Sequence, residues 1–184
     1  VLCKGAGNRY YYFGKTAGRV QEKKGIKKVT VNGKFIGWFC FPESGNNLQN
    51  TWNGGRYYLA DGRMASGVTK INGKYYFFQR SSASAYKGVA YKNKWIKYNN
   101  KYYYASGNST LIENGWKRLK SDGKYYYFLF QNCTAVTNKS GVKRGGVYGS
   151  LDSRGRFIEA GWVVASNKRN LVRFMDSKTG KYVK

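Results

Sequence analysis

The aromatic residues of this chain recur in a fixed local setting, and their rings are the side chains best suited to contact a ligand. Tyr76, Tyr103 and Tyr126 each lie in a run of aromatic residues directly after a turn, and Trp116 and Trp162 each follow a glycine. An aromatic face packs against the apolar C–H face of a sugar ring, while neighbouring polar groups bond its hydroxyls. The candidates for those polar contacts flank the same aromatic runs: Gln79, Gln131, Lys74 and Lys124. These residues predict an aromatic pocket for a carbohydrate.

The competing interpretation is that the rings form the core of the protein. For any single tyrosine, packing explains the residue better than ligand binding does, because aromatic side chains bury large apolar areas. For the whole array, at least one exposed aromatic pocket is expected. Trp38, Trp52 and Trp95 rank below the other aromatic candidates, since their place in the repeated pattern is less clear from the sequence.

The acidic and cysteine residues do not form a catalytic or metal-binding pattern. All four Asp residues lie in or beside predicted turns, which accounts for them structurally. A two-carboxylate glycosidase needs its carboxyl groups roughly 5–9.5 Å apart, and no such pair is evident. The chain has no His, and its three cysteines form no CxxC pair, so neither a general base of the commonest type nor a zinc site is indicated. We therefore predict a non-enzyme without cofactor or metal.

The charge of the chain is strongly unbalanced. Lys and Arg number 34 and Asp and Glu 8, which gives a net charge of +26. Solubility of a small domain requires a net charge of only about 2–8 in magnitude, so the excess favours an anionic neighbour. No apolar stretch reaches the length of about 18 residues that a membrane span requires. The N-terminal residues lack the layout of a signal peptide, and the chain is expected to be a fragment of a longer protein.

A local phrase recurs along the sequence: a turn dipeptide, a Lys or Arg, and then a run of aromatic residues. The copies are Asn8–Phe13, Asn32–Ile36, Asn53–Tyr58, Asn72–Phe78, Asn99–Tyr104 and Asp122–Phe128. Asn-Gly and Asp-Gly supply the two residues of positive φ that a type I′ turn requires, and alternating residues precede them. The phrase therefore predicts β-hairpins, most clearly over 67–78 and 115–128 and in a divergent form over 161–174.

The hairpins are separated by short polar connectors with Asp-Gly or Asp-x-x-Gly turns at Asp61–Gly62, Asp152–Gly155 and Asp176–Gly180. Residues 88–104 fit one hairpin or two, and the charged run 21–28 fits a connector or a strand edge but not a helix. An isolated hairpin is marginally stable, whereas stacked hairpins bury each other's aromatic faces. The predicted fold is all-β, a solenoid or ribbon of stacked β-hairpin repeats of about 20 residues.

The predicted domain organisation is a single repeat array over 1–184. Its clearest repeats lie within 51–130, and its divergent repeats cover 5–50 and 131–184. Cys3, Cys40 and Cys133 are each expected to be small buried residues, as unpaired cysteines usually are. Their redox state is left open, because three cysteines can form at most one disulfide.

The pattern of Gly-Trp, a turn with Lys, and Tyr-Tyr-Phe at intervals of about 20 residues resembles the cell-wall-binding repeats. These repeats occur in choline-binding proteins, in the glucan-binding domains of glucansucrases and in the C-terminal repeats of clostridial toxins. The resemblance implies hairpins in a solenoid, carbohydrate or choline bound between repeats, and a non-catalytic module of a secreted or bacterial cell-surface protein.

Two departures from the choline-binding pattern bear on the ligand. Gly-Trp is intact only at Trp116 and Trp162, with Val68 and Val89 at other repeats, and the runs after the turns hold Tyr or Phe in place of Trp. A cation such as choline also gains nothing electrostatically from a domain of charge +26. A glucan or another cell-wall polysaccharide is therefore the predicted partner.

The sequence leaves two alternatives open. The repeats could form a protein-adhesion or scaffold module that only presents other domains. The basic surface could instead bind a polyanion such as teichoic acid or nucleic acid, with Tyr stacking on bases. No recognised nucleic-acid motif accompanies the charge, so nucleic acid is expected only as a non-specific polyanion.

Overall fold

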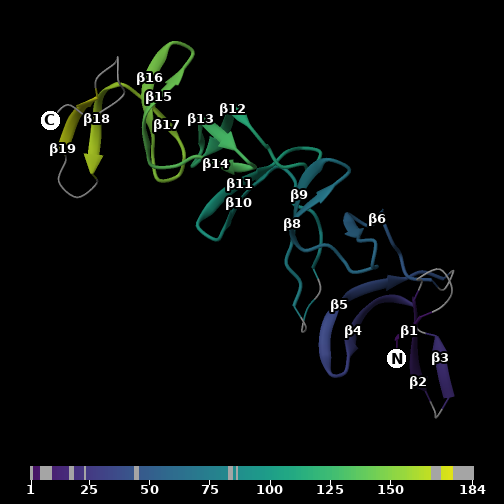
Figure 1. Cartoon of the computed structure of the whole chain (residues 1–184). Coiled ribbons are helices and arrows are strands. Elements are labelled where there is room, and N and C mark those ends of the chain that lie inside the picture. Colours follow the sequence, from purple (N-terminus) through teal and green to yellow (C-terminus); the bar gives the residue numbers. More distant parts are fainter. Residues whose placement is uncertain are drawn as a thin grey trace. The chain divides into compact units, whose positions relative to one another are not determined.

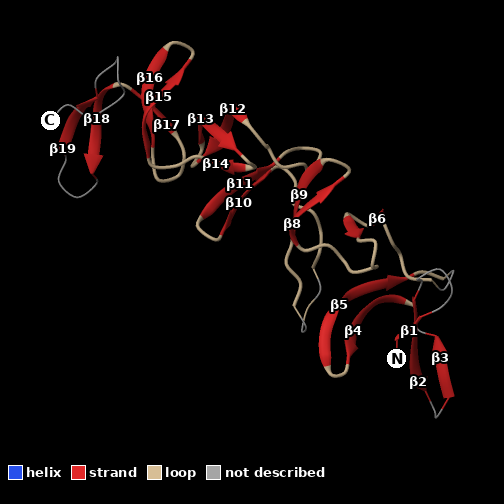
Figure 2. Cartoon of the chain, viewed as in Figure 1, coloured by secondary structure: helices blue, strands red, loops and turns tan. Residues whose placement is uncertain are grey.

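The structure is a computed structural model that describes residues 2–4, 10–16, 19–22, 24–43, 46–82, 85, 87–166 and 171–175, with side chains described from 24 to 160 inside those ranges. All the regular secondary structure in these residues is β-strand (Figure 2). Over the same ranges, no helix has the length and apolar character needed to cross a membrane. The all-β class predicted from the sequence is confirmed.

The hairpin turns have the backbone conformation that their residues predict. Asn72 and Gly73 have φ angles of 47° and 80°, and Asp122 and Gly123 have φ angles of 50° and 81°. Two successive positive φ angles are the mark of a type I′ turn, whose twist matches that of the flanking strands. Asn99 and Asn100 adopt the same conformation without any glycine, because Asn tolerates the left-handed region better than other residues do.

The chain forms two compact units, of which the first comprises Val1–Lys92 and Gly107–Thr110. The strands of this unit are β1 (Leu2–Lys4), β2 (Tyr10–Thr16), β3 (Arg19–Glu22), β4 (Gly25–Val31), β5 (Lys34–Phe41), β6 (Thr51–Asn53), β7 (Arg56–Tyr58), β8 (Gly67–Ile71) and β9 (Lys74–Phe78). Strands β1, β2 and β3 form an antiparallel sheet, and the others pair as the hairpins β4–β5, β6–β7 and β8–β9 (Figure 1). The charged run 21–28 is thus divided between two strands, in agreement with the prediction that it is not helical.

The second unit comprises Asn93–Ser106 and Leu111–Lys184. Its strands are β10 (Lys94–Tyr98), β11 (Lys101–Ala105), β12 (Gly115–Ser121), β13 (Lys124–Gln131), β14 (Thr134–Ala135), β15 (Lys139–Arg144), β16 (Val147–Leu151), β17 (Phe157–Glu159), β18 (Gly161–Ser166) and β19 (Leu171–Met175). The hairpins predicted over 67–78, 115–128 and 161–174 are all present as antiparallel pairs. The ambiguous segment 88–104 contains one hairpin, β10–β11.

After its second strand, each central hairpin is followed by a short return segment that pairs with that strand. Tyr58 pairs with Met64, Phe78 with Ala90, and Ala105 with Leu111, and strands β14 and β17 fill the same role after β13 and β16. Two of the predicted Asp turns form these returns, with Gly62 donating its N–H to the Leu59 carbonyl and Gly155 to the Asp152 carbonyl. The third predicted turn, at Asp176–Gly180, lies outside the described residues.

The core consists of small clusters that join neighbouring hairpins inside each unit. In the first unit, Cys40 of β5, Tyr58 of β7 and Met64 are buried together. In the second unit, Phe128 and Phe130 of β13 are buried with Ala135, and Trp95 and Tyr104 of the preceding hairpin pack against them. Stacking of successive hairpins through aromatic faces, as the sequence predicts, therefore holds within each unit.

Two of the three cysteines, Cys40 and Cys133, have side chains within the described residues. Cys40 and Cys133 are buried, with 7% and 5% of their surface exposed. Burial raises the pKa of the Cys40 thiol, an effect that hydrogen bonds from Tyr58 and Asn53 only partly offset. The expectation of small buried residues is confirmed for both, whereas the side chain of Cys3 lies outside the described residues.

Candidate ligand-binding site

Most of the tryptophans occupy one recurring position in the hairpins. Trp52, Trp95 and Trp116 are each the second residue of the first strand of a hairpin, the place that Val68 takes in β8. Trp52 and Trp95 rank low on the sequence because their place in the repeated pattern is unclear, and the residues directly before them are Thr51 and Lys94, not Gly. The structure shows that Asn50 and Asn93, two residues before each Trp, have φ angles of 47°. An asparagine in the left-handed conformation therefore marks these two repeats.

Trp95 is the centre of an aromatic cluster in the second unit. Its ring centroid lies 4.6 Å from that of Phe128, 5.2 Å from that of Tyr104 and 5.9 Å from that of Phe130. The indole Nε1–H donates a 3.0 Å hydrogen bond to the backbone carbonyl of Lys120. These contacts fix the orientation of the ring although it is only half-buried.

A pocket of about 350 Å³ opens beside this cluster. Its apolar wall is formed by Trp95, Tyr102 and Phe128, and its polar wall by Lys120, Ser121, Asp122 and Arg154. The pocket is referred to below as the Trp95 pocket. It combines an aromatic surface with charged hydrogen-bonding groups, the usual composition of a small-molecule site.

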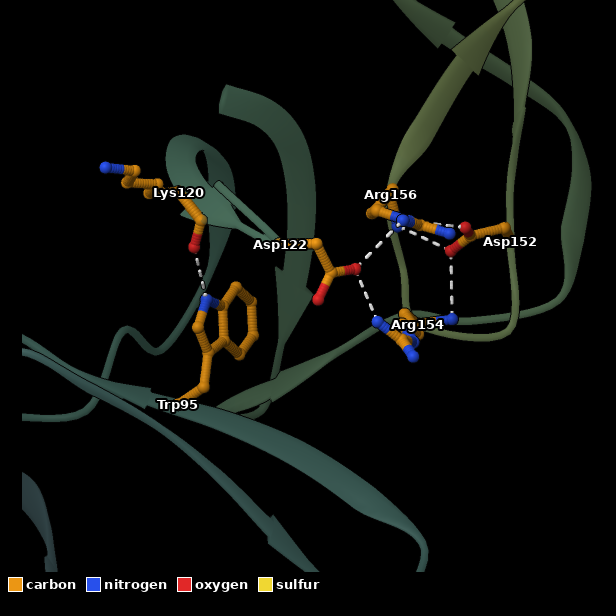
Figure 3. A network of polar contacts seen from close by, with 6 residues as sticks. All are labelled: Trp95, Lys120, Asp122, Asp152, Arg154 and Arg156. Carbon is orange, nitrogen blue, oxygen red and sulfur yellow. Dashed lines mark hydrogen bonds and ion pairs between the residues drawn. The ribbon is translucent and has the colours of Figure 1, made fainter. Parts of the chain in front are cut away.

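The polar wall is held by a network of two aspartates and two arginines (Figure 3). Asp122 lies at the turn of the β12–β13 hairpin, and its Oδ2 accepts hydrogen bonds from Nη1 of Arg154 and, at 3.2 Å, from Nη1 of Arg156. Asp152 accepts from the backbone N–H groups of Arg154 and Arg156 at 2.9 Å each and from Nε of Arg156 at 2.7 Å. The network therefore ties the turn of one repeat to the return segment of the next.

Arg156 is the best anchored member of this network. The hydrogen bond to Asp152 is the main cause that raises its pKa, and burial only partly opposes it. Its guanidinium also lies 5.2 Å from the centroid of the Tyr126 ring, a cation–π distance. Arg156 therefore remains charged and fixes one face of a predicted ligand-binding residue.

Cations of the protein itself cover several of the tyrosine rings. Three cross-strand pairs place a Lys Nζ at 5.1–5.5 Å from a Tyr ring centroid: Lys70–Tyr75, Lys97–Tyr102 and Lys143–Tyr148. Arg118 lies 4.8 Å from the ring centroid of Tyr125, and Arg144 lies 3.2 Å from that of Tyr127. In each pair, an internal cation occupies the ring face that a ligand cation would need.

The aromatic residues predicted as ligand contacts lie in different settings. Tyr76 is half-buried with its ring centroid 5.1 Å from that of Trp52. Tyr103 is 9% exposed, which leaves little of its ring for a ligand. Trp116 packs edge-on against Phe157 at 5.2 Å between ring centroids. The side chain of Trp162 lies outside the described residues.

The predicted polar contacts are spread over the hairpins. Gln79 uses its backbone in the return after β9, where its N–H donates to the carbonyl of Val89. Lys124 and Gln131 are exposed at the two ends of β13, and Lys74 is exposed at the start of β9. Of the predicted ligand residues, Tyr126 packs against the cluster around Trp95, and Lys124 pairs with Ser121 at the edge of the Trp95 pocket.

Comparison with known proteins gives a structural match without a sequence match. No family model matches the chain, and no curated protein matches it. The choline-binding domain of CbpL from Streptococcus pneumoniae superposes with a TM-score of 0.53 at 24% identity, over 88% of this chain and 78% of that one. CbpJ from the same species matches with a TM-score of 0.55 at 20% identity, over 85% of this chain and 47% of its own.

A further similar structure is choline-binding protein F of Streptococcus pneumoniae in the presence of a peptidoglycan analogue. It has a TM-score of 0.57 at 18% identity and covers 99% of this chain and 78% of its own. This chain thus spans about half the length of CbpJ and over three quarters of the other two. At identities below 25%, these superpositions show the fold alone, and they confirm the resemblance that the repeats indicate. The chain has the β-hairpin repeat fold of the choline-binding domains.

Proposed function

We propose that the chain is a non-catalytic carbohydrate-binding module that binds a cell-wall or extracellular polysaccharide, glucan-like in character, through the Trp95 pocket. The observation that carries this proposal is the meeting of an aromatic wall and a charged hydrogen-bonding wall in one pocket of about 350 Å³. The volume falls within the usual range of ligand pockets, about 300–1,000 Å³. It suits one or two sugar rings of a longer chain.

The pocket offers the two kinds of contact that a sugar ring requires. The ring of Trp95, together with the part of the Tyr102 ring that lines the pocket and is not covered by Lys97, can pack against the C–H face of a pyranose. Oδ1 of Asp122 can accept from a sugar hydroxyl, while Arg154 retains N–H groups that can donate. Because Asp122 and Arg154 are already bonded to each other, the wall is oriented before ligand arrives, which lowers the entropic cost of binding.

Choline is the second candidate ligand, favoured by the fold that the chain shares with choline-binding domains. The electrostatics of the pocket oppose it. Lys97 lies over the ring of Tyr102, and Arg154 lines the same pocket. A quaternary ammonium would have to enter beside these two cations, with Asp122 already bonded to two arginines. A neutral sugar meets no such repulsion.

The net charge of +26 adds a sequence-independent attraction to anionic polymers. On this proposal, the basic surface strengthens adhesion to an anionic wall polymer such as teichoic acid, and the protein acts outside the cell or at a bacterial cell surface. The alternative of a protein-adhesion or scaffold module predicts a protein partner and no glycan binding. The alternative of a nucleic-acid binder predicts retention of single-stranded DNA at physiological salt.

Retention on insoluble α-glucan and on purified wall polymers tests the proposal, at about 0.15 M and about 1 M salt. Binding through the Trp95 pocket should survive high salt and should be lost in Tyr102→Ala. The matched control is Tyr75→Ala, which removes the equivalent cross-strand tyrosine of the β8–β9 hairpin. Excess choline should not elute the protein.

Three results would contradict the proposal. These are no retention on any polysaccharide at either salt concentration, equal loss of retention in the Tyr102 and Tyr75 variants, and elution by choline. The last result would establish the second candidate. Capture of a protein partner without glycan binding would establish the scaffold alternative.

A further inference from the structure

A second pocket, of about 270 Å³, lies in the first unit and has a different chemistry from the Trp95 pocket. Its apolar wall includes Phe35, Trp38 and Met64, and its polar wall is formed by Arg63, Ser66 and Ser81. No carboxylate is among its lining residues in the described part of the unit. We call it the Arg63 pocket.

Hydrogen bonds and ring contacts with neighbouring residues hold the apolar wall of the Arg63 pocket in position. Nε1–H of Trp38 donates a 2.7 Å hydrogen bond to the carbonyl of Ser82, and Phe35 meets the Trp38 ring edge-on at 6.4 Å between centroids. The backbone N–H of Met64 donates to the Trp38 carbonyl at 2.8 Å. Ser81 closes the far side, with its Oγ 4.0 Å from Sδ of Met64. The wall is therefore in place before any ligand binds.

Ser81 and Ser82 belong to an extension that distinguishes this return segment from the others. Phe78 pairs with Ala90, whereas Tyr58 pairs with Met64 and Ala105 with Leu111 after a much shorter path. At the ends of the extension, the backbone N–H of Gln79 donates a hydrogen bond to the carbonyl of Val89. Within it, Oγ of Ser81 accepts a hydrogen bond from the backbone N–H of Lys87 at 2.8 Å. The extension therefore adds Ser81 to the pocket beside the β4–β5 hairpin, a contribution that the shorter return segments of the other repeats do not make.

Arg63 is held in position by its own turn. Asp61 accepts from the backbone N–H of Arg63 at 3.0 Å and from its Nε at 2.6 Å. The methylene stem lies over Gly37, since a Cβ at that glycine would come within 3.2 Å of Cγ of Arg63. Within the described ranges, the hydrogen bond of the Arg63 side chain is made by Nε and not by either Nη, and about half of the side chain is exposed. The Nη edge of the guanidinium is therefore available for a ligand.

Arg156 occupies the equivalent place in the second unit, one residue after the turn glycine. Its guanidinium, however, is already bound to other residues of the protein. It donates to Asp152 and to Asp122 and covers the ring of Tyr126. Arg63 has one carboxylate partner where Arg156 has two. The arginine of this turn therefore joins neighbouring repeats in the second unit, whereas in the first unit it leaves the two Nη groups of Arg63 available as donors.

We propose that the Arg63 pocket is a second binding site, for a sugar residue that carries a carboxylate or phosphate group. Two oxygens of the anion would bridge Nη1 and Nη2 of Arg63, the bidentate geometry for which a guanidinium is suited. The ring of the sugar would lie against Trp38 and Met64. This site is independent of the Trp95 pocket, and it would let the protein discriminate among anionic polymers, which net charge alone cannot do.

The test uses the whole chain labelled with ¹⁵N, because the indole N–H of Trp38 reports directly on this pocket. Its resonance is assigned by its absence in Trp38→Phe. Glucuronic acid, glucose 6-phosphate, glucose and choline are titrated separately at about 0.15 M salt, which screens general attraction between exposed charges. The Trp38 resonance should shift with one or both acidic sugars and not with glucose or choline.

Two variants separate specific recognition from the effect of the overall charge. Arg63→Gln should weaken binding of the acidic sugar at least about tenfold, the effect of losing about 1.4 kcal/mol. Arg118→Gln lowers the net charge by the same amount in the other unit and should leave the titration unchanged.

The two acidic sugars also distinguish a carboxylate from a phosphate ligand. A Trp38 resonance that shifts with neither acidic sugar would overturn the proposal. So would equal weakening in Arg63→Gln and Arg118→Gln. Neither outcome bears on the Trp95 pocket, which is followed through the indole resonance of Trp95.

Discussion

Nε1 of Trp95 donates a hydrogen bond to the backbone carbonyl oxygen of Lys120, 25 residues further along the chain. The donor lies in the first strand of one hairpin and the acceptor near the turn of the next. A hydrogen bond of this kind fixes one repeat against its neighbour, and it also sets the angle at which the indole faces the pocket. On the proposed function, the stability of the protein and the binding of ligand in the Trp95 pocket both depend on this indole nitrogen.

Replacement of Trp95 by Phe tests this link. The variant keeps an aromatic ring but removes the N–H donor, so we expect a loss of about 1–2 kcal/mol in the free energy of unfolding from the missing hydrogen bond and the smaller ring. Urea denaturation measures it. The control is Trp52→Phe, because Trp52 has the same position in its hairpin and contacts Tyr57, Tyr76 and Phe78 through its ring alone in the described contacts. An equal loss in both variants would show that the hydrogen bond contributes nothing.

The two aspartates of the network should contribute unequally. Asp152 accepts two backbone N–H groups as well as Nε of Arg156, so Asp152→Ala should lower the free energy of unfolding by about 1–2 kcal/mol. Asp122 binds the arginines through exposed side-chain contacts, so Asp122→Ala should cost less than about 1 kcal/mol. The loss in Asp122→Ala should also shrink in high salt. Thermal unfolding at two salt concentrations checks the order, and a larger effect of Asp122→Ala would contradict it.

We predict that any side chain at Gly149 destabilises the protein, because neighbouring atoms leave no space for a Cβ. A Cβ there would lie 2.3 Å from the carbonyl oxygen of Ile158 and 2.6 Å from the ring of Phe157. Gly149→Ala should therefore destabilise the protein by about 1–3 kcal/mol, as overpacked residues do. Gly123→Asn is the control, since a Cβ there meets nothing within 4 Å and Asn tolerates the positive φ of 81°. Denaturation midpoints that fall equally in both variants would disprove the steric explanation.

The Cys40 thiol should react slowly at neutral pH. Burial raises its pKa, so the reactive thiolate is rare in the folded protein. The folded pKa lies above the unfolded one, so Cys40 contributes stability that is complete below the unfolded pKa and is lost as pH rises through the folded pKa. Iodoacetamide labelling followed by mass spectrometry should show Cys40 alkylated more slowly than the same residue in urea. Equal rates in the folded and urea-treated protein at pH 8 would contradict the prediction.

The sequence predicts the hairpins well because their signal is local. Asn72-Gly73 and Asp122-Gly123 both adopt the conformation that a type I′ turn requires, and the residues around them alternate over a few positions. The return segments are harder to predict, because β14 and the isolated pair of Phe78 with Ala90 depend on contacts with strands that are already formed.

The sequence predicts an aromatic pocket but not the residues that line it, for a related reason. Trp95 ranks low on the sequence because its place in the repeated pattern is unclear: Lys94 stands where Gly115 precedes Trp116, although the two tryptophans have the same position in their hairpins. The pairing of Asp122 with Arg154 and Arg156 joins residues more than 30 positions apart, and nothing in the spacing of these residues indicates it. Tyr103 illustrates the opposite case, in which the residue type suited a ligand but the ring is buried.

Every sheet in the described residues is built from consecutive strands. A hairpin of this kind can form as soon as its own residues are free to move, without waiting for a distant part of the chain. Proteins rich in local contacts fold faster than β proteins whose strands pair over long distances. The chain should therefore gain structure progressively while it is still being synthesised, with each completed hairpin providing the surface on which the next one settles.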